Sequence, residues 1–196
     1  MRAWARFLTL TGVIALTPAA GVPGLYQPGR YTVDPAATHV HFHVKALVGK
    51  YEGDLREPTG EVVIDPGLPD RASIDISFPV ETLTTGDAST DAMLKGESFF
   101  DMRRYPTVRF TADAAPLATT AGDTRIDGQL TMHGITLPTT LAVRLVGVTP
   151  DEAPSISTLR FTGAMTVERS KFGMGFGRPF VADRVELAVD AIFHRS

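Results

Sequence analysis

Three histidines lie at alternate positions in one short segment of the chain. His39, His41 and His43 are separated by apolar residues, and alternate side chains of a strand project from one face about 6.5–7 Å apart. Imidazole nitrogens bind zinc, nickel and copper, which makes the row a weak candidate metal site. A straight strand does not converge three imidazoles on one ion, and the apolar residues between them predict that the row faces solvent.

A fourth histidine, His133, precedes Gly134 between two segments of strand-like sequence. It is a candidate head-group ligand or general base. No serine or carboxylate is spaced to act with it, which favours a turn histidine bonded to backbone groups. G-x-S-x-G, H-E-x-x-H and paired-carboxylate spacings do not occur in the sequence. We therefore expect no catalytic residues and no enzymatic activity.

A glycine-rich run, Gly173-Met-Gly-Phe-Gly-Arg178, has the composition of a phosphate-binding loop. It lies between two predicted strands with no helix after it, so the P-loop and dinucleotide contexts are both missing. We predict a mobile loop at the mouth of the fold, with Phe172, Met174 and Phe176 facing a lipid. Arg178 would contact an anionic head group, because guanidinium matches phosphate geometry; a flexible turn with an unrelated charge is the alternative.

Alternation of apolar and polar residues dominates the rest of the chain and indicates half-buried strands. Turn signals such as Asp65-Pro66-Gly67 separate the alternating segments. The chain is therefore predicted to be all-β and mostly antiparallel, with eight or nine strands. The predicted strands are 30–34, 38–46, 59–65, 72–80, 106–113, 124–132, 138–148, 157–168 and 182–194.

One short helix is predicted near 87–96, because this stretch lacks alternation and contains Ala92, Met93 and Leu94. Asp87 or Ser89 could cap it, and Gly96 would end it. One helix among many strands favours a barrel with a plug or lid, since closure removes open edges. The predicted cavity lining is apolar and suits binding rather than catalysis: Phe42, Val44, Phe78, Phe99, Phe100, Phe110, Phe161, Met165 and Leu187.

Composition excludes several classes of protein. The 196 residues contain no cysteine, so thiol nucleophiles, disulfides and cysteine-bound zinc are excluded. A net charge of −3 provides no basic footprint for nucleic acid. The length fits a single domain with its own core.

The N-terminal segment differs from the rest. Arg2 and Arg6 precede an uncharged apolar run over 7–16 and the small residues Ala19-Ala20-Gly21. This layout is typical of a secretory signal peptide, and the run is too short for a membrane-spanning helix. We expect residues 1–21 to be a signal peptide, with an approximate cleavage site, and 22–196 to be an exported, periplasmic barrel domain.

Several blocks together resemble the YceI-like, polyisoprenoid-binding, lipocalin-like family. The most discriminating are Ser98-Phe-Phe-Asp101 with Tyr105-Pro106, and Leu130-Thr-Met-His-Gly-Ile-Thr-Leu-Pro138. Arg169-Ser-Lys-Phe-Gly173 resembles the family's R-x-x-F-G turn. The chain departs from the family pattern at the predicted mouth, where Gly86, Met93, Lys95 and Lys171 replace the usual residues.

The resemblance implies an extended eight-stranded antiparallel barrel that holds an isoprenoid, quinone-like or fatty-acyl lipid without any required cofactor. A membrane redox protein and a second copy of the chain stay open as further partners. Two alternatives to lipid carriage also stay open. One is a metal-dependent factor or enzyme that uses the His39, His41 and His43 row. The other is a stress-linked interaction protein whose barrel is only a filled core.

Overall fold

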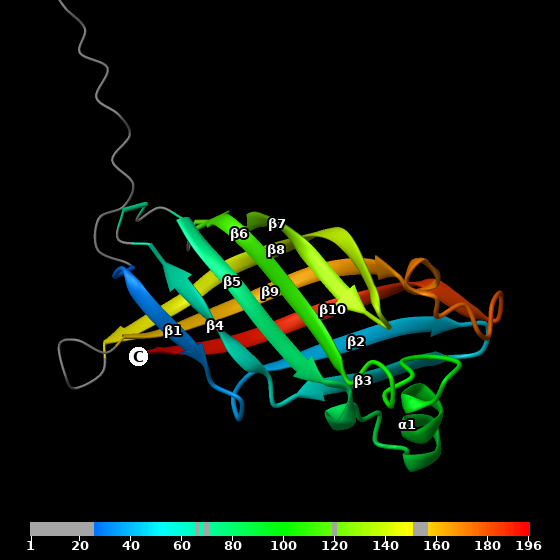
Figure 1. Ribbon diagram of the computed structural model, residues 1–196. Helices are drawn as coiled ribbons and strands as arrows, with labels where there is room; N and C mark the ends of the chain where they lie inside the picture. The colour runs from blue at the N-terminus through cyan, green and yellow to red at the C-terminus, as the bar shows by residue number, and fades with distance from the viewer. Residues whose placement is uncertain (1–25, 66, 69–70, 119–120, 151–156) are drawn as a thin grey trace, which may run out of the picture.

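A computed structural model describes residues 26–196 apart from 66, 69–70, 119–120 and 151–156 (Figure 1). The predicted signal peptide, 1–21, lies outside the described residues. The described part contains one α-helix, α1 (Ala88–Lys95), and two 3-10 helices, η1 (Val80–Thr82) and η2 (Arg169–Phe172). Its ten strands are β1 (Gly29–Val33), β2 (His39–Ala46), β3 (Lys50–Arg56), β4 (Thr59–Ile64), β5 (Arg71–Pro79), β6 (Thr107–Pro116), β7 (Thr124–Met132), β8 (Ile135–Pro150), β9 (Ser157–Glu168) and β10 (Val181–Arg195).

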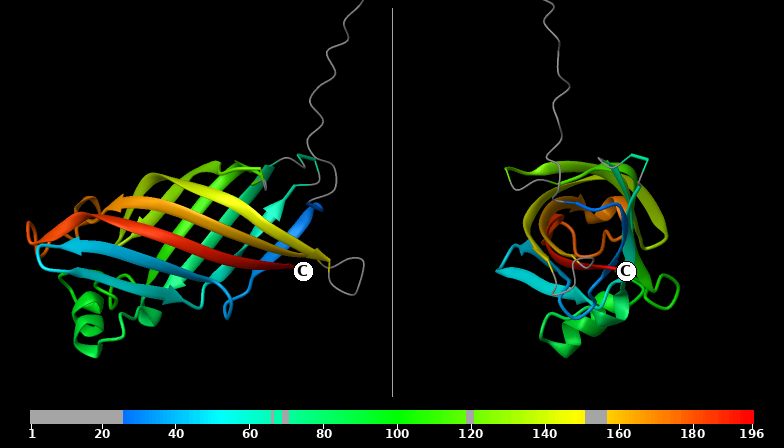
Figure 2. Two further views of the ribbon diagram at one scale, coloured as in Figure 1. Left: turned by 180° about the vertical axis from the view of Figure 1, so that it is seen from behind. Right: turned by 90° about the vertical axis from the view of Figure 1, so that its left-hand side faces the viewer.

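Eight of these strands close into an antiparallel barrel, as predicted. The pairing order is β1-β4-β5-β6-β7-β8-β9-β10, and β1 returns to β10 through Tyr31 and Arg195. Viewed from one end, the strands form a ring (Figure 2). Closure satisfies the backbone groups that an open sheet would leave at its edges.

β2 and β3 form a flap that continues the sheet beside the ring. β10 is long enough to pair with β2 through Val181–Asp190 and then with β1 through Phe193–Arg195. β3 pairs with β2, and its outer edge is fixed by Asp54, whose N–H donates to the Thr84 carbonyl at 2.8 Å. The flap therefore widens the barrel at the end where β2 and β3 meet.

The β3 segment was not among the predicted strands. Lys50–Arg56 reads KYEGDLR, in which charged residues and a glycine outnumber apolar ones. Only Tyr51, Gly53 and Leu55 face inward, so the apolar alternation is short and interrupted. The prediction of eight or nine strands was therefore one or two too few.

The predicted helix is present as α1 and is capped by Asp87, whose side chain accepts from the Thr90 N–H at 2.7 Å. Gly96 follows its last residue. The helix lies outside the ring, beside one end of the barrel (Figures 1 and 2). It therefore acts as a lid over one side of the opening and not as an internal plug. Within the described residues, no helix is long and apolar enough to span a membrane.

Inward-facing side chains pack most densely at the end opposite α1. Tyr31, Ile64, Leu159 and Phe193 form a core cluster there, and the first three are at most 1% exposed. The Tyr31 hydroxyl donates to the Gln27 carbonyl at 2.8 Å. Several inward-facing side chains are thus almost fully buried toward the far end.

Candidate functional site: an apolar cavity along the barrel

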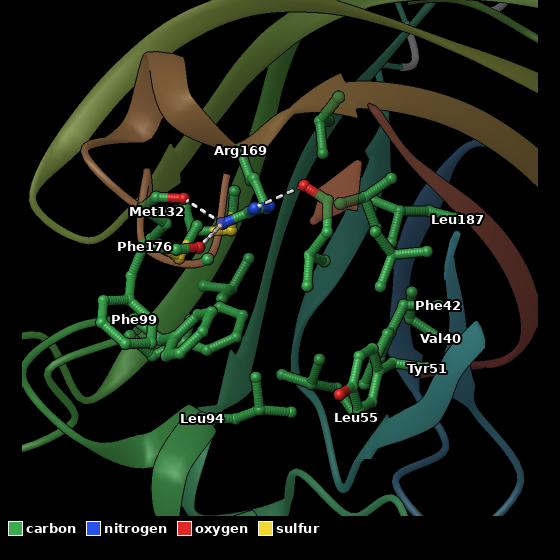
Figure 3. A pocket seen from close by; sticks show the side chains of 18 of the residues that line it. Val40, Phe42, Tyr51, Leu55, Leu94, Phe99, Met132, Arg169, Phe176 and Leu187 are labelled. Carbon is green, nitrogen blue, oxygen red and sulfur yellow. Dashed lines mark hydrogen bonds between the residues drawn. The ribbon is translucent and has the colours of Figure 1, made fainter. Parts of the chain in front are cut away.

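A cavity of about 240 Å³ lies at the helix end of the barrel (Figure 3). Tyr51, Met93 and Phe176 line it and are also substantially exposed, so they border its opening, which we call the mouth. Its walls come from β2, β3, β10, α1 and the segments that follow α1 and η2. The other lining residues include Val40, Phe42, Val44, Leu55, Phe78, Leu94, Phe99, Phe100, Val108, Leu130, Met132, Val167, Arg169, Met174, Val185 and Leu187.

A second cavity of about 160 Å³ continues toward the far end. The two cavities share five lining residues, which we call the girdle: Val40, Phe78, Val108, Leu130 and Leu187. They come from β2, β5, β6, β7 and β10 and therefore encircle the interior. The site is consequently an elongated apolar space in two adjoining parts that share the girdle residues.

Tyr26, Leu117 and Ala118 line the second cavity near the far end. Tyr26 stacks on Phe161 with ring centroids 6.5 Å apart, and its hydroxyl donates to the Ala118 carbonyl at 2.7 Å. Burial, with a smaller contribution from nearby Tyr31, raises the pKa of the Tyr26 phenol. Tyr26 is thus a neutral aromatic side chain whose polar atom is already bonded.

Arg169 is the charged residue that lines the first cavity, and it is only 5% exposed. Its guanidinium donates to the carbonyls of Met174 at 2.6 Å, Phe176 at 2.7 Å and Val181 at 3.0 Å (Figure 3). It also donates to the Ala182 carbonyl at 2.9 Å. These bonds tie the segment after η2 to the start of β10. Arg169 therefore holds the wall of the mouth and has little donor capacity left for a ligand.

Arg169 thus fastens the predicted loop at 173–178 to the start of β10. Asp183 supports the same region by accepting from the N–H and hydroxyl of Ser170 at 2.8 and 2.6 Å. Although burial raises the pKa of the Asp183 carboxyl, the bonds from Ser170 and the nearby charges of Arg178 and Arg169 together outweigh burial, and the pKa is lowered. Asp183 consequently stays ionised beside the two arginines of this segment, Arg169 and Arg178.

The structure brings most of the sequence-predicted ligand residues to the two cavities. Phe42, Val44, Phe78, Phe99, Phe100, Met174 and Phe176 line the first cavity. Phe110, Phe161 and Met165 line the second, which Phe78 and Leu187 also border. Their contact with a ligand stays a prediction.

Two of the predicted residues lie elsewhere. Phe172 is buried in a cluster with Leu130, Met132 and Val167 and lines neither cavity. Arg178 is also absent from both linings, and its guanidinium lies 3.6 Å from the Asp183 carboxylate. Alternating sequence does not reveal which side of a turn faces the interior, which explains both placements.

The histidine row lies on the outer face of β2, as predicted. Each imidazole faces a carboxylate on a neighbouring strand: His39 lies 3.6 Å from Asp190, His41 2.9 Å from Asp54, and His43 3.8 Å from Glu52. Across the described ranges, no three His, Cys, Asp or Glu side chains are placed to hold a metal ion. The row forms separate cross-strand pairs.

His133 is a turn histidine, which confirms the interpretation favoured from sequence. Its Nδ1 lies 2.8 Å from the Phe172 carbonyl, and its ring meets Tyr105 edge-on with centroids 5.0 Å apart. It therefore joins the β7–β8 turn to η2, close to the mouth but not in its lining.

Sequence reasoning missed several residues of the site. Tyr51 and Leu55 belong to β3, which was not predicted, and Tyr26 precedes the first predicted strand. Arg169 was noted only as part of a turn motif. No signal in the sequence distinguishes Arg169 from the neighbouring charges of Glu168 and Lys171.

Comparisons with known proteins agree with this geometry. The chain is 24% identical over 164 residues to a UPF0312 protein of Pseudomonas savastanoi pv. phaseolicola, covering 82% of this chain and 84% of the relative. The crystal structure of BcnA from Burkholderia cenocepacia has a TM-score of 0.67 at 25% identity, covering 82% of this chain and 98% of that one.

A polyisoprenoid binding domain from Saccharophagus degradans, implicated in plant cell wall breakdown, has a TM-score of 0.61 at 12% identity. That match covers 85% of this chain and 98% of the domain, and it shows the shared fold. The model of the YceI-like domain matches residues 31–193, nearly the whole barrel. The chain therefore belongs to the YceI-like domain family.

Proposed function

We propose that this protein binds and carries a lipid with a long apolar chain, such as an isoprenoid, a prenylated quinone or a fatty-acyl lipid. The observation that carries the proposal is the elongated apolar space, in which cavities of about 240 and 160 Å³ share the girdle residues. Together they reach the lower part of the range for ligand pockets, roughly 300–1,000 Å³. The polyisoprenoid-binding description of one structural neighbour is in keeping with such a ligand.

An apolar chain needs few polar contacts to bind tightly in such a space. Each buried methylene contributes about 0.8 kcal/mol, and aromatic and methionine side chains adapt to irregular chains. Phe42, Phe100 and Met132 are of this kind in the first cavity. The interior is therefore suited to the tail of the ligand.

The head group belongs at the mouth. Arg169 donates to four backbone carbonyls, and the Tyr26 hydroxyl donates to the Ala118 carbonyl. Thr38, which lines the second cavity, accepts from the Ile192 N–H at 2.9 Å. Burying an unpaired charge beside such groups would be costly, so a polar head group stays near solvent while the tail enters.

The same lining supports binding rather than catalysis. The two cavities are lined mostly by apolar side chains, and the charged one, Arg169, is bonded to four carbonyls. Acid–base chemistry would need a general base within reach of the substrate. We accordingly propose a carrier and not an enzyme.

The proposed location is the periplasm. Its support is the signal-like sequence of 1–21. Cell fractionation, with N-terminal sequencing of the accumulated protein, tests it. An uncleaved chain in the cytoplasmic fraction would contradict this part of the proposal.

The ligand itself is tested by extracting the purified protein with organic solvent and identifying the extract by mass spectrometry. The expected result is a stoichiometric prenyl or acyl lipid. An empty protein that also takes up no prenyl or fatty-acyl probe would overturn the proposal. A water-soluble probe of similar size serves as the negative control.

A further inference from the structure

Two loop tips at the helix end carry the most exposed large apolar side chains. In the β2–β3 turn, Leu47 is 77% exposed and Val48 is 90% exposed. In the segment between η2 and β10, Phe176 is 60% and Phe180 65% exposed. The Leu47 N–H donates to the Phe180 carbonyl at 2.7 Å, so the two tips form one continuous apolar surface, which we call the tip surface.

The tip surface projects from the extreme end of the barrel. Figure 2 shows the β2–β3 turn and the orange-to-red segment before β10 side by side at that end, while α1 lies to one side. The bonds from Arg169 to the carbonyls of Met174 and Phe176 fix the second tip. Exposed apolar side chains on a pre-ordered support lose little entropy when they bind.

Basic residues surround these apolar side chains. Lys45 and Lys50 flank the first tip, and Arg178 lies between Phe176 and Phe180. Within 45–51 and 169–182 the exposed basic residues are Lys45, Lys50, Lys171 and Arg178, and no acidic residue occurs there; the fifth basic residue, Arg169, is buried.

Some of this positive charge is balanced by neighbours. Lys50 lies 2.7 Å from Glu52, Lys171 lies 3.1 Å from Glu168, and Arg178 lies 3.6 Å from Asp183. The connection between β5 and β6, 80–106, has five acidic and three basic residues. It runs through α1, which lies beside the barrel and not at its extreme end. Lys45 has no ion pair with any residue that the structure describes. The outermost surface is therefore apolar and basic.

We propose that the tip surface docks the protein on an anionic lipid bilayer, with Leu47, Val48, Phe176 and Phe180 entering the interface. Lysine and arginine beside apolar side chains suit such a surface, because their stems lie among apolar groups while their charges meet lipid phosphates. The negative charge of such a membrane surface attracts the basic residues beside the apolar ones.

Docking would bring the mouth of the cavity to the lipid. Phe176 belongs both to the tip surface and to the cavity lining, and its ring meets Phe99 edge-on with centroids 5.6 Å apart. This inference deepens the proposed function, since it names the surface across which a lipid would enter. Adhesion to a bilayer does not itself depend on a bound ligand, so the two can be tested separately.

The test is co-sedimentation of the mature chain with vesicles of phosphatidylcholine and phosphatidylglycerol in equal parts, against vesicles of phosphatidylcholine alone. We expect binding to the anionic vesicles that weakens as salt is raised. The triple variant Leu47→Ser, Val48→Ser, Phe180→Ser should reduce binding about tenfold or more. Lys45→Gln with Lys50→Gln should reduce binding and its dependence on salt.

Matched controls are available on other surfaces. Leu68→Ser with Val146→Ser removes exposed apolar side chains elsewhere, and Arg125→Gln with Arg160→Gln removes exposed charges from β7 and β9. These variants should bind like the parent, and thermal melting confirms that all variants fold.

Equal binding by tip and control variants would overturn the docking surface, as would an absence of binding. A dimer in sedimentation velocity that the triple variant dissociates would assign the surface to a second copy instead. Vesicle binding by a protein with an empty cavity would contradict only the proposed lipid carriage. A protein that contains a bound lipid but does not bind vesicles would contradict only the docking.

Discussion

Phe42 lies directly over Gly53, its register partner in the flap. A methyl group at Gly53 would lie 2.8 Å from the Phe42 ring and 2.4 Å from the Thr84 carbonyl oxygen. The ring thus occupies the space that the side chain of any residue other than glycine would need at position 53. This contact fixes Phe42 in the cavity wall and lets Asp54 bond to Thr84.

Gly53→Ala should therefore destabilise the fold by about 1–3 kcal/mol, because the inserted methyl must displace the ring or the Thr84 backbone. Urea unfolding followed by circular dichroism measures the change. Gly147→Ala is the matched control, since a methyl there has no atom within 4 Å. Equal stability of the two variants would show that the flap yields without cost.

Much of the barrel was predictable, because apolar alternation in strands such as β9 and β10 reports directly on which face is buried. The helix was also predictable, since Asp87 and Gly96 mark its ends. β3 was not, because its inward face consists of Tyr51, Gly53 and Leu55, and the glycine interrupts the pattern. Its role depends on a contact with Phe42 that no local sequence signal encodes.

The apolar lining was predictable as a class of side chain, but its polar anchor was not. Arg169 is buried and donates hydrogen bonds to backbone carbonyls between Met174 and Ala182. Every residue has a backbone carbonyl, so the sequence does not indicate these acceptors. Phe172 and Arg178 show the same limit: both lie in the expected segment, but the chain turns them away from the cavity. Placement within a turn depends on backbone bonds that form only in the folded chain.

Arg169→Lys should destabilise the protein by about 3 kcal/mol or more, although it keeps the charge. A lysine ammonium cannot span four carbonyls as the planar guanidinium does, and buried acceptors left unbonded are costly. Chemical denaturation measures the loss. Arg184→Lys, at an exposed position in β10, is the control and should be nearly neutral. A parent-like Arg169→Lys protein would disprove the anchoring role.

The cap of α1 should titrate at unusually low pH. Bonds from Ser89 and from the N–H of Thr90 lower the pKa of Asp87 to about 2. A lowered carboxyl pKa stabilises the folded state above the unfolded value of about 4, and this contribution disappears as pH falls through the folded pKa. The cap should hold at pH 4 and fail near pH 2.

The amide resonance of Thr90 in nitrogen–proton correlation spectra checks this prediction, with an expected midpoint of about 2. Asp87→Asn keeps a good capping group but cannot ionise, so its Thr90 resonance should show no such transition. A midpoint near 4 in the parent would mean that the cap does not form.

The histidine row should not contribute to lipid binding. His39, His41 and His43 face outward and meet separate carboxylates, so replacing all three with alanine leaves the cavity lining untouched. Retention of a fluorescent prenyl probe should be unchanged within about twofold, since exposed ion pairs contribute little to stability. Elemental analysis accompanies the assay. Loss of both a bound metal and probe retention in the variant would favour the metal-dependent alternative.

Leu187→Trp should shorten the chain that the protein can hold. Leu187 belongs to the girdle that joins the two cavities, and an indole there would obstruct the passage to the second one. Excluding even two methylenes costs about 1.6 kcal/mol, more than tenfold in Kd. Affinities for a series of prenyl alcohols of increasing length measure the effect, and short members should bind like the parent. Ala188→Trp, on the outer face of the same strand, should not distinguish long from short chains. Parent-like affinity of the Leu187→Trp variant for the longest chains would show that the ligand does not cross the girdle.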